Sequence, residues 1–341
     1  MKKIVYYEYL RIIATVAVVI IHVSMCLPNN YSISKLGIHN SAVMNSTYLL
    51  VNWAVPVFIM ITGALLLNPQ KNVNYKKIFH YVMRMTIVLF FFGGGYSIIE
   101  LFIKGHKINY DLLFDGLLNT IQGNSWSHMW YIYMLIGLYL ITIPLRQVVK
   151  YSSKKHLEIL LFILVIGNFV IQTINISLSL ELENYMQWSH YITYFLMGYY
   201  LSIISIDKIP KMASGIFFII ISFIRFFLDY FWISNFAEIS DLAQNGRIFV
   251  LMQAVSIFIF ARQNLNLLKI NFVLSNISRC SFAIYLIHPI WGNLFFKMLN
   301  FTPLLFPSPL IGIIIISLII FCLSWILSYL MIKIPYINKI V

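Results

Sequence analysis

The chain has 341 residues, of which 60% are hydrophobic and 10% are charged, and its formal net charge is +13. Soluble domains carry about 25% charged residues, so this composition excludes a cytosolic enzyme, a nucleic-acid-binding domain and a disordered chain. The composition instead predicts a polytopic membrane protein, provided that long uncharged segments are present. The three cysteines lack the spacing of a metal site, and we expect them to be packing residues rather than ligands.

Ten apolar segments follow one another along the chain, each close to the ~20 residues that cross a bilayer as a helix. Their approximate limits are 9–27, 46–67, 78–101, 127–148, 157–177, 188–206, 212–232, 246–262, 278–299 and 309–332. We therefore expect an all-α integral membrane fold of about ten transmembrane helices. The segments between them are short, the longest being the outer loop at about 102–126. A single transmembrane domain over 1–341 with no soluble domain is predicted, so any chemistry must lie among the helices.

The basic residues predict the orientation. With the N-terminus in the cytoplasm, only five of the 24 Lys and Arg residues fall in outer loops, namely Lys35, Lys104, Lys107, Arg247 and Lys297. Cytoplasmic loops collect Lys and Arg, so both termini are predicted to be cytoplasmic. Four arginines lie within or at the ends of spans: Arg11, Arg84, Arg225 and Arg279. Because a charge inside a bilayer is costly, these four are candidate functional residues.

The first span combines three ionisable side chains. Arg11 and His22 are eleven residues apart, which places them on the same helix face about 16 Å apart along the axis. Glu8 precedes Arg11 by three residues and can pair with it. This pattern predicts a pathway with an ion pair at the cytoplasmic mouth and an imidazole about halfway through the membrane. The alternative is a packing histidine with an arginine anchored at the interface.

Later spans contain further candidates for binding a substrate: Asn52, His128, Trp130, Tyr131, Arg225 and His288. Simpler roles are open for several of them. Trp130 is placed where an interfacial aromatic belt is common. Arg225 can pair with Asp229 one turn later, and His288 can be a hydrogen-bonded structural residue.

Four stretches in order resemble the membrane-bound acyltransferase-3 family. The first is the Arg11–ten residues–His22 pattern, and the second is VPVFIMITG at 55–63. The third is SHMWY at 127–131 followed by LIGLYL at 135–140, and the fourth is SFAIYLIHP at 281–289. The chain is most similar to the stand-alone branch that resembles surface polysaccharide O-acetyltransferases.

This resemblance implies transfer of an acyl group, usually acetyl, from cytoplasmic acyl-CoA to a hydroxyl of a cell-surface or lipid-linked carbohydrate. Acetyl-CoA is then a donor substrate, and no permanently bound cofactor, metal or nucleic acid is expected. His22 matches the essential histidine of the family and is expected to be the general base, with an acyl-histidine as the less favoured alternative. Arg11 is expected to hold a CoA phosphate or order the entrance, and Glu8 stands where the family usually has Asp. A bacterial plasma membrane is the expected location.

The third span departs from the family pattern. The family often has Arg-x-x-Arg here as a CoA contact, whereas this chain keeps Arg84 but has Tyr at 81 and Ile at 87. Lys77 and His80 lie within about two turns of Arg84 and are the expected substitutes. The resemblance also implies that His128, Trp130 and Tyr131 lie beside the acceptor. Two other functions stay open: a transporter or exporter of a glycan or small solute, and a scaffold that binds CoA without turnover.

Overall fold

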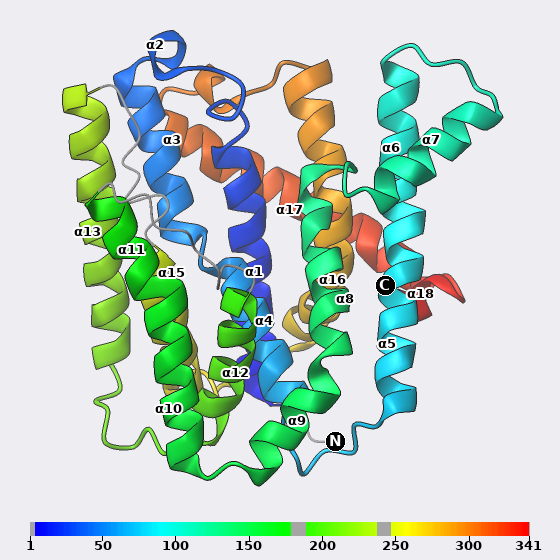
Figure 1. Ribbon diagram of the computed structural model, residues 1–341. Helices are drawn as coiled ribbons and strands as arrows, with labels where there is room; N and C mark the ends of the chain where they lie inside the picture. Colours follow the sequence, from blue (N-terminus) through cyan, green and yellow to red (C-terminus); the bar gives the residue numbers. More distant parts are fainter. Residues whose placement is uncertain (1–3, 179–188, 237–246, 341) are drawn as a thin grey trace. The chain divides into compact units, whose positions relative to one another are not determined.

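The computed structural model describes residues 4–178, 189–236 and 247–340, and throughout these ranges the regular secondary structure is helical (Figure 1). The predicted all-α fold is confirmed. The described residues divide into two compact units. Unit 1 takes in those of Met1–Leu65 and Lys154–Met331, and unit 2 takes in those of Leu66–Ser153 and Ile332–Val341.

In the part of the chain that the structure describes, each of the ten predicted spans contains helix. Within the described residues, six segments are long and apolar enough to cross a membrane: Val5–Ser24, Ile38–Leu66, Tyr75–Ile103, Lys154–Ser177, Ala213–Phe236 and Pro309–Lys333. A seventh candidate, Ser127–Leu140 with Thr142–Tyr151, is bent by 50°. The protein is therefore a multi-pass membrane protein, while the number of ten spans and the cytoplasmic termini stay predictions.

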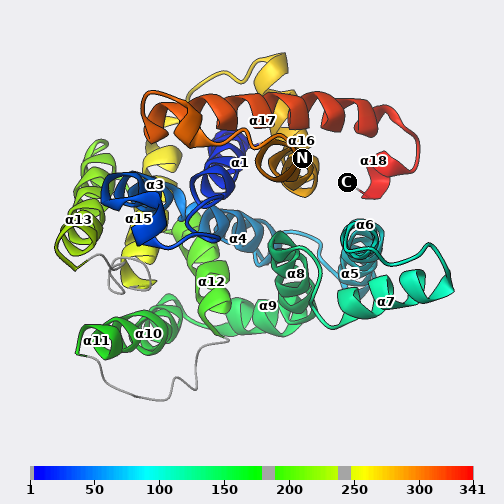
Figure 2. The same cartoon turned by 90° about the horizontal axis from the view of Figure 1, so that it is seen from above.

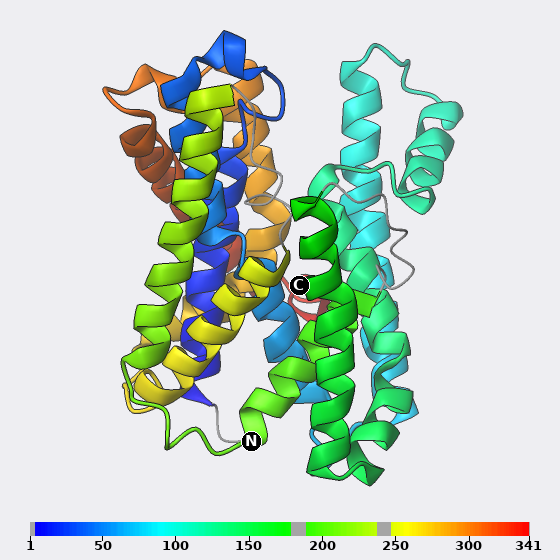
Figure 3. The ribbon, with the colours of Figure 1, turned by 60° about the vertical axis from the view of Figure 1, so that its left-hand side comes forward.

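Unit 1 contains most of the helices. They are α1 (Val5–Ser24), α2 (Ile33–Leu36), α3 (Ile38–Val51), α4 (Ala54–Leu66), α10 (Lys154–Val165), η3 (Ile166–Val170), α11 (Ile171–Ser177), α12 (His190–Ile203), α13 (Ala213–Phe236), α15 (Arg247–Asn264), α16 (Phe272–Asn293), η5 (Leu294–Met298), η6 (Pro303–Leu305) and α17 (Pro309–Lys333). Helix α1 packs against α16, α3 and α15. Helix α13 stands beside α3, and α15 crosses its lower half (Figure 3).

Helix α17 runs obliquely past α1 and α16, which Figure 2 shows along one side of it. Trp325 on α17 donates its indole N–H to Asn276 Oδ1 on α16 at 2.8 Å. This hydrogen bond satisfies the polar end of a large apolar side chain.

Two glycines allow α4 and α12 to approach closely. A Cβ added at Gly63 would collide with the backbone carbonyl of Phe195, and one added at Gly198 would collide with that of Met60. Small residues at helix crossings are the usual means of close packing in membrane proteins. Close packing of α4 against α12 therefore explains why the VPVFIMITG stretch ends in a glycine, Gly63.

Unit 2 is smaller. Its helices are α5 (Tyr75–Val88), η1 (Leu89–Gly93), α6 (Gly94–Ile103), α7 (Tyr110–Ile121), η2 (Ser127–Met129), α8 (Trp130–Leu140), α9 (Thr142–Tyr151) and α18 (Ile337–Ile340). The predicted outer loop at 102–126 contains α7, which corrects the sequence interpretation. Asn109 caps this helix by accepting the N–H of Leu112 at 3.0 Å. Its twelve residues mix apolar and acidic side chains, so the sequence has no continuous apolar segment there from which this helix could be predicted.

Two arginines counted as markers of the cytoplasmic side also satisfy helix ends. Arg146 donates to the carbonyls of Leu66, Asn68 and Lys71, at and just beyond the end of α4. Arg262 donates to the carbonyls of Leu201 and Ile204 at the end of α12. The last carbonyls of a helix have no partner within the helix. These guanidinium groups therefore take the place of water at the C-terminal ends of α4 and α12.

Candidate active site

The first half of α1 holds the predicted ion pair. Arg11 Nη1 lies 3.3 Å from Glu8 Oε1. The Glu8 side chain is 9% exposed and that of Arg11 is 29% exposed, so the carboxylate is enclosed while the guanidinium still reaches solvent. Thr15, one turn later, donates to the Arg11 carbonyl at 2.7 Å. A carboxylate at this distance pairs with the guanidinium and orients it.

His22 lies in the last turn of α1, which ends at Ser24. The sequence interpretation set this imidazole about halfway through a span that began at residue 9. The helix begins earlier, at Val5, so most of its length precedes the histidine. The same-face relation to Arg11 holds, because 5–24 is an unbroken helix with eleven residues, about 16 Å, between the two side chains.

His288 on α16 faces His22. The centroids of the two imidazole rings are 4.9 Å apart, and the ring planes are inclined by 52°. The two histidines are far apart in sequence and meet because α1 packs against α16. This contact joins the first and the fourth family-like stretch, and it places two titratable groups together inside unit 1.

Local structure fixes the His288 ring. The side chain is 1% exposed, and Nδ1 lies 3.1 Å from the Ile284 carbonyl oxygen one turn earlier. A carbonyl oxygen only accepts, so Nδ1 carries the proton and donates it. Pro289 follows and has no N–H for the helix ladder, yet α16 continues to Asn293, whose amide donates to the Pro289 carbonyl at 3.0 Å.

Asn52 and Arg225 are also brought together within unit 1. Arg225 is fully buried, and its Nη1 lies 2.8 Å from Asn52 Oδ1, 3.0 Å from the Leu49 carbonyl and 2.6 Å from Gln253 Oε1. The Gln253 amide donates to Ser222 Oγ at 2.9 Å. Asp229, one turn after Arg225, is fully buried as well.

This polar cluster sits where the second predicted span is broken. Helix α3 ends at Val51 and α4 begins at Ala54. In an unbroken helix the Leu49 carbonyl would accept from residue 53; here it accepts from Arg225 and Gln253. Sequence reasoning missed Gln253, although an uncharged polar residue in an apolar segment is itself a signal. These hydrogen bonds show that Arg225 stabilises the break between α3 and α4.

The candidate donor-binding residues of unit 2 share one face of α5. Lys77 and His80 are exposed, and Arg84 lies seven residues, about two turns, after Lys77. Arg84 is half-buried and its Nε donates to the Ile340 carbonyl of α18 at 2.7 Å. The chain near residue 340 therefore lies against the arginine that the family pattern singles out.

The fourth-span candidates face different surroundings. His128 is buried beside Tyr96 and Trp126, with ring centroids at 5.6 Å and 6.2 Å, and these two neighbours stack on each other at 4.2 Å. Tyr131 is buried, whereas Trp130 is 43% exposed. His128 thus lies in an aromatic cluster of unit 2, and Trp130 has the exposure of an interfacial belt residue.

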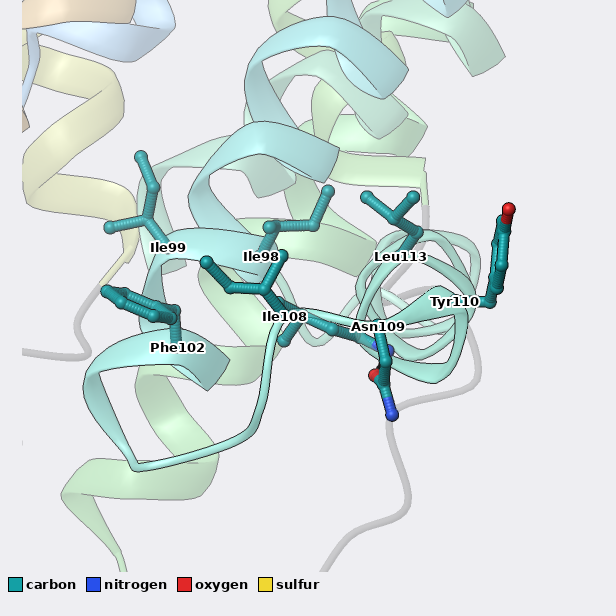
Figure 4. A pocket seen from close by; sticks show the side chains of 8 residues that line it. Ile98, Ile99, Phe102, Ile108, Asn109, Tyr110 and Leu113 are labelled. Atoms are coloured by element: carbon teal, nitrogen blue, oxygen red, sulfur yellow. Dashed lines mark hydrogen bonds between the residues drawn. The ribbon is translucent and has the colours of Figure 1, made fainter.

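Unit 2 also contains an apolar cavity of about 500 Å³ between α6, α7 and the turn that joins them (Figure 4). It is lined by Ile98, Ile99, Phe102, Ile108, Asn109, Tyr110, Leu112 and Leu113. The side-chain oxygen of Asn109 is used in capping α7, and apart from Asn109 and Tyr110 the lining side chains are aliphatic or phenylalanine.

One comparison with known proteins gives a match. A family model described as an acyltransferase domain matches residues 4–329, which takes in parts of both units. No curated protein and no solved structure matches the chain. The match includes all twelve candidate side chains described above.

Proposed function

This chain belongs to the membrane-bound acyltransferase-3 family, whose domain covers residues 4–329, and from that membership we propose that it is an O-acyltransferase that uses acyl-CoA. The proposed acyl group is acetyl, and the proposed acceptor is a hydroxyl of a cell-surface or lipid-linked carbohydrate. The proposed location is the plasma membrane of a bacterium. The observation that supports the proposal is the contact between His22 and His288, which brings two imidazole rings together inside unit 1.

The chemistry requires a base near neutral pH, and histidine suits that task. His22 takes the proton of the acceptor hydroxyl as its oxygen forms a bond to the acyl carbonyl carbon. The carbon–sulfur bond then breaks, and the CoA thiolate leaves and takes up the proton that His22 holds. The acyl group ends on the carbohydrate oxygen, so every proton and electron pair is accounted for.

The donor carries phosphates, and two separate sets of cations are candidates for binding them. Arg11, oriented by Glu8, is the cation on the helix of His22. Arg84, Lys77 and His80 form the set on α5. Guanidinium binds phosphate in a bidentate way, while an ammonium acts as a point charge.

The acceptor-binding roles of His128, Trp130 and Tyr131 remain part of the proposal. For Asn52 and Arg225 we propose a structural role instead of acceptor binding, because the Arg225 guanidinium already donates to three oxygens.

The test is release of free CoA by the purified protein from acetyl-CoA, with and without a glycan extract as acceptor, together with mass spectrometry of the acylated product. We expect release that depends on the acceptor and is lost in His22→Ala. His39→Ala is the matched control, because His39 is an exposed histidine on α3, and it should behave as wild type. Wild-type product from His22→Ala, or solute uptake into liposomes without CoA consumption, would contradict the proposal.

A further inference from the structure

We propose that the segment 334–340, which contains α18, is a strap that covers Arg84 and must leave it before a phosphate of acyl-CoA binds there. The inference rests on the proposed function, because it takes Arg84 as a cation that binds acyl-CoA. It adds regulation to that role, since the protein then carries its own competitor for the site. The strap and Arg84 both belong to unit 2.

The strap already uses part of the Arg84 guanidinium. Nε of Arg84 donates to the backbone carbonyl of Ile340 at 2.7 Å, and α18 packs against α5 (Figure 1). The arginine side chain is half-buried. A phosphate that binds through Nε needs the same N–H that the Ile340 carbonyl now accepts. The strap and the phosphate therefore compete for one group.

The chemistry of the two acceptors decides which one prevails. The Ile340 carbonyl is neutral, whereas acyl-CoA offers a phosphate anion that can take two N–H groups of a guanidinium in a bidentate pair. An anion also compensates the charge of a half-buried guanidinium, which a carbonyl does only in part. Acyl-CoA at sufficient concentration therefore displaces the strap, and the strap raises the concentration that is needed.

The strap is held loosely. Within the segment, Ile337 and Ile340 are half-buried and the other residues are exposed. Helix α18 has four residues, which is too short for a helix to be stable without the surface on which it packs. Little apolar surface is therefore uncovered when the segment leaves α5, as expected of a strap that a ligand displaces.

The turn that leads into α18 is strained. Tyr336 has a φ of 77°, in the left-handed region that a residue with a Cβ rarely adopts. This tyrosine is 76% exposed, and Lys339 Nζ lies 5.7 Å from the centroid of its ring. Because the strain is relieved when the segment leaves Arg84, it favours the open state and keeps the strap displaceable.

A chain that stops at Lys333 tests the strap directly. Two constants are measured on the purified protein: KM for acetyl-CoA in the transfer assay, and Kd for free CoA by isothermal titration calorimetry. We expect both to fall roughly three- to tenfold, the worth of one net hydrogen bond. The value of kcat should not change, because saturating acetyl-CoA displaces the strap. In the Arg84→Gln background, truncation should leave both constants unchanged, since the group for which the strap competes is gone.

Substitutions at Tyr336 shift the strap in opposite directions without shortening the chain. Tyr336→Gly relieves the strain, holds the strap on Arg84 and should raise both constants about threefold. Tyr336→Pro fixes φ at about −65°, prevents the turn and should lower both constants as truncation does. Tyr336→Ala is the matched control, because it removes the same ring but keeps the strain, and its constants should stay within about twofold of wild type.

The outcomes separate the strap from the proposed function. If the wild-type protein transfers acetyl and truncation leaves KM and Kd unchanged or raises them, the proposed function stands and this inference fails. Equal constants in Tyr336→Gly and Tyr336→Pro would also overturn the inference. If truncation tightens CoA binding while no acceptor is acylated, the strap stands and the proposed transfer fails. A protein that binds no CoA, with or without the strap, removes both.

Discussion

In unit 1 most of the candidate side chains are enclosed by other protein groups, Arg11 being the exception, whereas in unit 2 two of the three predicted donor-binding side chains are exposed. His288 and Arg225 are at most 1% exposed and each is bonded to a neighbouring helix or to its own backbone. Lys77 and His80 are exposed on α5. In the proposed function, the enclosed groups of unit 1 carry out the proton transfer and the long cations of unit 2 bind the polyanionic donor.

The comparison predicts two kinds of loss. Changes in the buried groups of unit 1 should lower the free energy of unfolding or kcat. Changes in the cations of unit 2 should raise KM for the donor and leave the fold intact. The four predictions below test this division, beginning with the largest expected effect.

Arg225→Met should destabilise unit 1 by about 3 kcal/mol or more, because buried oxygens of Leu49, Asn52 and Gln253 lose their common donor. Thermal unfolding of the purified protein in detergent measures the loss. Gln253→Leu alone should also destabilise, and the double variant should cost less than the sum of the two, because they share one network. Strictly additive losses, or a stable Arg225→Met with poor acceptor affinity, would contradict the bracing role.

Gly63→Ala should cost about 1–3 kcal/mol, because the new methyl group collides with the Phe195 backbone, which cannot move as a side chain can. The same unfolding measurement applies. Gly137→Ala on α8 is the matched control, since an added Cβ there meets nothing within 4 Å and should stabilise slightly or have no effect. An equal response of the two variants would show that the α4–α12 crossing is not closely packed in solution.

The predictable part of this protein is local. Apolar segments of about 20 residues predict helices because the bilayer leaves the backbone no other partner, and the Glu8–Arg11 pair follows from a spacing of three. The contacts of His22 with His288 and of Arg225 with Asn52 and Gln253 join different helices, and no spacing within one segment encodes them. Helix α7 was missed for a different reason, since its acidic residues interrupt the apolar pattern on which the span assignment depended.

Arg84→Gln should raise KM for acetyl-CoA about tenfold, equivalent to about 1.4 kcal/mol, with kcat unchanged, because one charge-assisted contact to phosphate is lost. It should also expose the segment around Ile340 to limited proteolysis, since the Arg84–Ile340 bond is removed. Arg279→Gln is the matched control: this arginine at the end of a predicted span is exposed on α16, and its loss should leave KM unchanged. A fall in kcat alone for Arg84→Gln would place the residue in the chemistry instead of in donor binding.

The smallest effect is expected at the outer end of unit 2. Asn109→Ala removes the cap of α7 and should cost about 1 kcal/mol of local helix stability. Faster hydrogen exchange of the amides at 110–121 measures this loss, and Asn109→Ser should retain most of the protection because serine also caps. Acyl transfer should stay within about twofold of wild type, since the cavity beside α7 is lined mainly by apolar side chains and contains none of the proposed catalytic or donor-binding residues. Loss of transfer in Asn109→Ala would instead show that the α6–α7 hairpin contributes to acceptor binding. It would then contradict the proposed assignment of proton transfer to unit 1 and donor binding to unit 2.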